Sequence, residues 1–122
     1  MRLWHPELLQ ELPEKRLLAL HMSLCKVRQK PWGKPTPKTW YYNLSWSCFV
    51  WYHSAVVREM AARGWNPAAK WLNAQFRGKL PPAEMPNDYV TNYLSEFETV
   101  CFDKIEKQRR DLKKMGSKFA II

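Results

Sequence analysis

The stretch SWSCFVWYHSAVVREMAARG, residues 45–64, carries the clearest structural signal in the chain. Apolar residues recur along it every three or four positions, which is the spacing of one face of an α-helix. They are Phe49, Tyr52, Val56 and Met60. Ser45 or Ser47 can cap the first turn, and Gly64 is a typical helix stop. The pattern predicts a central core helix over residues 46–63.

A second helix is predicted on the N-terminal side, over residues 13–28. Pro13 and Glu14 are typical of a first helical turn, and apolar residues then recur with helical spacing. The residues expected on the buried face are Leu17, Leu18, Met22 or His21, and Cys25. The exposed face should carry Lys15, Arg16, Lys26 and Arg28.

The C-terminal part of the chain predicts one long helix over residues 88–114, capped by Asn87. Its apolar period runs through Tyr89, Tyr93, Phe97, Val100 or Cys101, and Ile105. Before it, Asn66 and Pro67 can open a short helix through residues 70–72. No run of alternating residues is long enough to predict a sheet. We therefore expect an all-α fold, a single compact domain over residues 1–122 with three principal helices.

Between the first two helices, residues 29–38 read QKPWGKPTPK. Three prolines and a glycine exclude a continuous helix here, so we predict a Pro-rich surface loop. The loop is also basic, because it carries Lys30, Lys34 and Lys38 without any acidic residue.

The charge balance of the chain indicates an anionic partner. Twenty Lys and Arg residues against eleven Asp and Glu give a formal net charge of +9. No acidic residue lies between Glu14 and Glu59. Nucleic acid is favoured over a membrane, because the chain has no long apolar run and its aromatic residues are interleaved with basic ones. A merely solvated basic surface is the plainer interpretation. Three aromatic residues, Trp40, Tyr41 and Tyr42, suit base stacking and a protein core equally.

The spacing of the cysteines and histidines along the chain does not predict a metal site. Cys25, Cys48 and Cys101 lie far apart in apolar segments, which predicts buried, reduced thiols. The three histidines, His5, His21 and His53, are individually more typical of hydrogen-bonded structural positions than of catalysts. We expect no cofactor and no metal. The opening MRLWHPELL lacks the features of a signal peptide, so we expect a cytoplasmic protein.

Several segments, taken in order, resemble the phage-type pyrimidine-dimer DNA glycosylases of the endonuclease V kind. They are MRLWHPELL, LP, LLALH, PWGK, YHSAVVREMAARGW and FRGK, spread over residues 1 to about 79. The resemblance implies an all-helical protein that excises damaged pyrimidines from duplex DNA and cleaves the abasic strand.

The resemblance also implies an unusual nucleophile, the α-amino group of the first residue, here Met1. An α-amine ordinarily has a pKa of about 8 against about 10.4 for lysine, so more of it is neutral at pH 7. Because Arg2 is large, we expect Met1 to be retained. Family enzymes also use a glutamate in a His-Arg-Glu segment, which reads His21-Met22-Ser23 here. Ser23 cannot replace a carboxylate in proton transfer, so a DNA-binding relative without catalysis is the alternative function.

The candidate catalytic residues are Met1, His21 and Ser23. The candidate DNA-binding residues are Arg2, Arg16, Lys26, Arg28, Lys30, Trp32, Lys34, Arg77 and Lys79. We expect the protein to act as a monomer on duplex DNA. An RNA-binding or protein-interaction module built on the basic loop is a third and weaker hypothesis.

Overall fold

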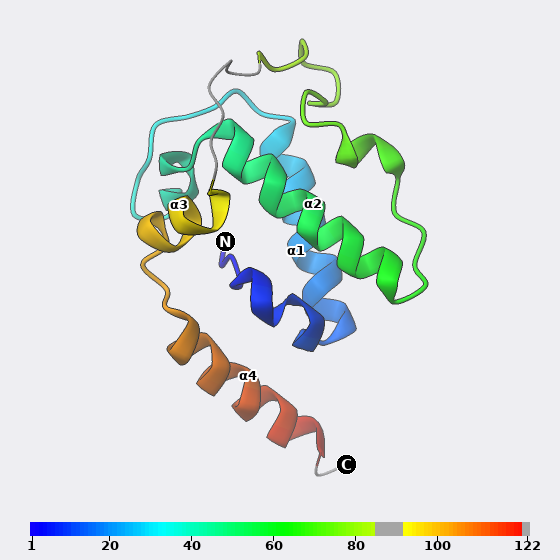
Figure 1. The fold of residues 1–122 in the computed structure, drawn as a ribbon, viewed down its shortest axis with the longest axis vertical. Helices are drawn as coiled ribbons and strands as arrows, with labels where there is room; N and C mark the ends of the chain where they lie inside the picture. The colour runs from blue at the N-terminus through cyan, green and yellow to red at the C-terminus, as the bar shows by residue number, and fades with distance from the viewer. Residues whose placement is uncertain (85–91, 121–122) are drawn as a thin grey trace.

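The computed structural model of the protein describes residues 1–84 and 92–120. Within these ranges the regular structure is entirely helical, which confirms the predicted all-α fold. The α-helices are α1 (Glu14–Arg28), α2 (Trp46–Ala62), α3 (Tyr93–Val100) and α4 (Ile105–Ala120). Three short 3-10 helices accompany them, η1 (Pro6–Glu11), η2 (Trp40–Asn43) and η3 (Ala69–Leu72). Figure 1 shows α1, α2 and α3 grouped around the N-terminus, with α4 leading away from them.

Helix α2 is the centre of the fold, as its sequence predicts. Ser45 caps it by accepting a hydrogen bond from the backbone N–H of Cys48 at 3.1 Å. The helix ends before Gly64, whose φ of 83° lies in the left-handed region that glycine adopts without strain. All four residues predicted on the apolar face are buried, and α2 packs against α1, η1, η3 and α3.

The buried face of α1 differs from the prediction. Leu18 and Met22 are 46% and 53% exposed, although they were expected in the core. The buried residues are Leu17, Leu20, His21, Leu24, Val27 and Arg28. They still follow one helical stripe, but the stripe includes a histidine and an arginine, so the apolar pattern alone pointed to the neighbouring stripe.

The predicted single helix over residues 88–114 is wrong. Two helices, α3 and α4, replace it, with Cys101 to Lys104 between them. Asn92 caps α3 by accepting from the backbone N–H of Ser95 at 2.9 Å. The proposed cap Asn87 and residues 88–91 lie outside the described part of the chain. The short helix predicted through residues 70–72 is present as η3, but it begins at Ala69 and not at the predicted opening, Asn66 and Pro67.

The break between α3 and α4 is explained by contacts with the N-terminal segment. Gln108, which is fully buried, accepts a hydrogen bond from the His5 backbone N–H at 2.6 Å. Its side-chain amide donates to the carbonyl of Leu3 at 3.1 Å and to that of Asp103 at 3.2 Å. These bonds hold the start of α4 against residues 3–5, at an angle that a helix continuous from α3 would not provide.

The three cysteines are free thiols, as predicted. Cys48 and Cys101 are buried, whereas Cys25 is half-buried. Burial raises the pKa of Cys48 to about 12 and that of Cys25 to about 11, so both are protonated at neutral pH. None of the described helices combines the length and the apolarity needed to cross a bilayer.

Candidate functional site

A cavity of about 490 Å³ opens beside the first residue. Met1 and Arg2 form one wall. Pro37 and Lys38 from the end of the Pro-rich loop and Trp40 from η2 form another. The remaining wall consists of Phe102 and Asp103 from the α3–α4 linker and Lys107 from α4. The cavity therefore gathers three segments that are distant in sequence.

The N-terminal segment that carries Met1 is firmly anchored. Leu3 and Trp4 are buried, and the Tyr52 hydroxyl donates to the carbonyl of Trp4. Arg2 donates to Asp103 Oδ2 at 2.5 Å and to Asp111 Oδ2 at 2.7 Å. Its guanidinium also lies 4.2 Å from the centre of the Trp4 ring. These contacts place Met1, which is 37% exposed, at the wall of the cavity.

The charges of the cavity favour an anion. Arg2 is paired with Asp103 and Asp111, and Lys38 and Lys107 add two further positive charges to the lining. Both lysines are exposed. The carboxylate in the lining is Asp103, whereas Glu11 and Glu14 line other surface cavities.

The three candidate catalytic residues are not brought together in this cavity. Met1 lines it, but His21 and Ser23 do not. Ser23 is half-buried on α1, and His21 is 9% exposed in a separate cluster between α1 and α2. Four residues of the lining that matter for its chemistry, Lys38, Phe102, Asp103 and Lys107, were absent from the candidate list.

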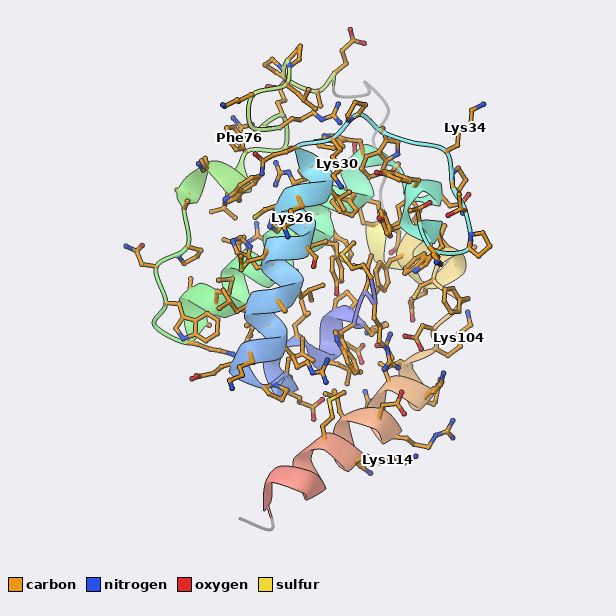
Figure 2. All side chains as sticks on the ribbon, turned by 180° about the vertical axis from the view of Figure 1, so that it is seen from behind. Lys26, Lys30, Lys34, Phe76, Lys104 and Lys114 are labelled. Atoms are coloured by element: carbon orange, nitrogen blue, oxygen red, sulfur yellow. The ribbon has the colours of Figure 1, made fainter. Side chains whose placement is uncertain are left out.

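Five of the candidate DNA-binding residues are exposed cations. They are Arg16, Lys26, Lys30, Lys34 and Lys79. Figure 2 shows Lys26 on α1 and Lys30 just beyond its C-terminal end, with Lys34 farther along the loop. That these residues bind DNA stays a prediction.

Trp32 and Arg77 are half-buried and support the loop from inside. The Trp32 ring makes edge contacts with Tyr42, Trp46 and Phe49, at centroid distances of 4.9 to 5.4 Å. Arg77 donates to the carbonyls of Lys30 and Arg28, and its guanidinium lies 4.6 Å from the Trp46 ring centre. Both contacts fix the beginning of the Pro-rich loop against α2.

Arg28 is buried, contrary to the prediction that it lies on the exposed face of α1. Its Nη1 donates to the carbonyl of Trp71 at 2.6 Å, and its Nη2 donates to those of Asn73 and Phe76 at 2.6 and 2.8 Å. Burial lowers its pKa to about 10, so it stays charged at neutral pH. Arg28 therefore pins residues 71–76 to α1 and is not free to bind phosphate.

Arg28 also orders a buried cluster of His21, Cys25 and His53, which the sequence spacing did not reveal. The donor atoms of this cluster lie within 4.8 Å of one another, close enough for a metal ion. Arg28 Nη1 lies 3.1 Å from His53 Nδ1, and a guanidinium can only donate. His53 Nε2 must then carry the ring proton, and it donates to His21 Nδ1 at 3.0 Å.

This proton arrangement opposes metal binding. An ion on His53 Nε2 would require the ring proton at Nδ1, where it would face the Arg28 guanidinium. Burial, Arg28 and His21 lower the pKa of His53 to about 2, and burial lowers the pKa of His21, so both rings are neutral. We interpret the cluster as a structural hydrogen-bond chain. That the protein binds no metal stays a prediction.

Residues 1–73 match the sequence profile of the family described as "Pyrimidine dimer DNA glycosylase". The chain belongs to this family. No curated protein and no solved structure gives a significant match. The matched part of this glycosylase-family protein contains Met1, α1, the Pro-rich loop, α2 and η3. The matched segment ends before three residues of the cavity lining, Phe102, Asp103 and Lys107. One wall of the Met1 cavity is therefore formed by a part of the chain that the family match does not cover.

Proposed function

We propose that the protein is a DNA glycosylase with abasic-site lyase activity, whose nucleophile is the α-amine of Met1. The observation that carries this proposal is the position of Met1, at the start of the family match, in a cavity that two exposed lysines also line. The lysines suit the phosphates on either side of a nucleotide, and the cavity is large enough to receive its sugar.

Residues of the cavity can supply the groups that this reaction needs. The neutral amine attacks C1′, a nitrogen–carbon bond forms, and the bond from C1′ to the base breaks with its electron pair leaving on the base, which takes up a proton. The nitrogen then loses a proton, and the sugar ring opens as the C1′–O4′ bond breaks with its electron pair going to O4′, which is protonated. At an abasic site the aldehyde oxygen leaves instead as water. The product in both cases is a protonated imine, whose positive charge the Asp103 carboxylate can stabilise. Removal of a C2′ proton then expels the 3′ phosphate, and water hydrolyses the imine.

A specific observation favours a DNA-binding protein without catalysis as the second candidate. Family-type enzymes have a glutamate where this chain has Ser23, and no acidic residue of α1 lines the Met1 cavity. In addition, the Asp103 carboxylate is already engaged by Arg2 at 2.5 Å, so it is not a free carboxylate in the cavity. The exposed cations of α1 and the loop would still bind phosphates.

Borohydride reduction in the presence of abasic duplex DNA distinguishes a lyase with Met1 as its nucleophile from a DNA-binding protein without catalysis. If the first proposal is right, reduction traps a covalent adduct that peptide mapping places at residue 1. Acetylation of the α-amine, or an N-terminal extension, should abolish trapping and spare DNA binding. Trapping at an internal lysine would refute the mechanism, and DNA binding without trapping would select the non-catalytic candidate.

A further inference from the structure

Phe102 is the most exposed of the large hydrophobic side chains in the described part of the chain, at 69%. It lies in the α3–α4 linker and lines the Met1 cavity. Its ring meets Trp40 edge to face, with the ring centres 5.6 Å apart and the planes at 80°. Trp40 itself is 8% exposed, so it gives the Phe102 ring a rigid support from one side.

The backbone on both sides of Phe102 is fixed. The Cys101 N–H donates to the carbonyl of Phe97 at 2.9 Å and closes α3. The side chain of Asp103 is bound by Arg2, and its carbonyl accepts from Gln108 at 3.2 Å. The ammonium group of Lys104 caps the Cys101 carbonyl at 3.3 Å. An apolar ring is thus presented to solvent by a linker with little freedom to turn it inward.

The residues around Phe102 indicate the kind of partner that its ring would contact. Lys38 and Lys107 share the cavity lining with it, and the exposed Lys104 lies two residues away. In Figure 2 the loop that carries Lys34 and the linker that carries Lys104 lie on the same side of the molecule. A single exposed aromatic ring among lysines is a poor match for an apolar protein surface. It suits a DNA duplex, because a base can stack on the ring while the phosphates bind the lysines.

We propose that Phe102 is a wedge that enters the base stack beside the nucleotide offered to Met1. This inference rests on the proposed DNA function and adds to it the residue that holds the duplex open. A side chain in this position fills the gap left by a displaced or missing base, so it favours damaged over intact DNA. Lysines in the same lining contact the backbone and contribute little to that preference.

Replacement of Phe102 by alanine tests the wedge. The protein should bind a duplex that contains a stable abasic analogue more tightly than the intact duplex. In Phe102→Ala this preference, measured as the ratio of the two affinities, should fall about tenfold. Affinity for the intact duplex should change little. A 2-aminopurine placed next to the analogue should lose the fluorescence change that the unaltered protein causes, since that probe reports stacking directly. Phe102→Trp should retain the preference and the signal.

Leu18→Ala is the matched control, because Leu18 is also an exposed apolar residue but lines a different cavity. It should leave both readouts unchanged. Far-UV circular dichroism and thermal unfolding verify that Phe102→Ala folds. An unchanged affinity ratio and an unchanged 2-aminopurine signal in Phe102→Ala would overturn the wedge. If instead the unaltered protein binds neither duplex at low salt, the proposed DNA function itself fails.

Discussion

At the scale of single residues, Arg28 shows how a basic side chain can be misassigned from sequence. Its position near the end of α1, beside an exposed Lys26 and Lys30, is typical of a phosphate contact. The fold instead uses its planar group to satisfy three carbonyls of residues 71–76 at once. Sequence periodicity carries no information on such long-range acceptors, and for the same reason it missed the cluster of His21, Cys25 and His53.

Arg28→Ala should therefore destabilise the protein by about 3 kcal/mol or more, because buried carbonyls lose charged donors. Arg28→Lys should recover only part of this loss, since one ammonium cannot reach all the acceptors. Chemical denaturation measures both values. Lys26→Ala is the control and should lie within about 0.5 kcal/mol of the unaltered protein. A fully stable Arg28→Ala with weakened DNA binding would restore the original phosphate-binding assignment.

Ser23 is the residue at which the chain departs from the family pattern. If the protein is a lyase limited by proton transfer and a side chain at position 23 reaches the bound sugar, Ser23→Glu should raise strand cleavage of abasic DNA about tenfold or more, since a positioned carboxylate can remove the C2′ proton. Ser23→Gln has the same shape without the charge and should not. Rates of cleavage under single-turnover conditions give the comparison. Equal rates in all three proteins would mean that position 23 is outside the reacting geometry, consistent with its absence from the cavity lining.

At the scale of elements, the sequence predicted α1, the Pro-rich loop and α2 well and the C-terminal helices poorly. The boundaries of α2 depend on local signals, Ser45 at its start and Gly64 after its end. The break after α3 depends on Gln108 and Asp103 binding residues 2–5, about a hundred positions away. Because the apolar period continues through Phe97, Cys101 and Ile105, nothing local marks the interruption.

The exposed cations at the end of α1 and in the loop should act together on DNA. Reversing Lys26, Lys30 and Lys34 to glutamate should weaken binding to every duplex sequence and reduce the salt dependence, because fewer counterions are released. Each lost phosphate contact should lower the slope of log K against log salt by about 0.9. The corresponding triple change to arginine keeps the charge and should keep the slope. A salt titration with unaltered slope in the glutamate variant would exclude this surface as the DNA contact.

At the scale of the whole molecule, the candidate site could not have been predicted as a unit. Met1 was identified through the family resemblance. Lys38 was recognised only as a basic residue of the loop, and Phe102 and Lys107 belong to a region predicted as the middle of one helix. Only the packing of α4 against residues 2–5 brings them to Met1. The buried cluster of His21, Cys25 and His53 lies elsewhere, between α1 and α2.

That cluster predicts how stability depends on pH. Burial, together with Arg28 and His21, lowers the pKa of His53 to about 2, and burial lowers the pKa of His21. The unfolded chain therefore binds protons below pH of about 6.5 that the folded protein does not, so stability falls as the pH is lowered through that value. Arg28 and Cys25, the other groups facing His53, keep their charge states in this range. The contribution of His53 to the slope should reach about 1.4 kcal/mol per pH unit between pH of about 6 and 5, and His21 should add to it in the same direction. His53→Gln, which can still accept from Arg28, should remove one histidine's share of this slope while remaining folded at pH 7.5. Urea unfolding of both proteins across this range measures the difference, and parallel pH profiles would show that His53 is protonated equally in the folded and unfolded chains.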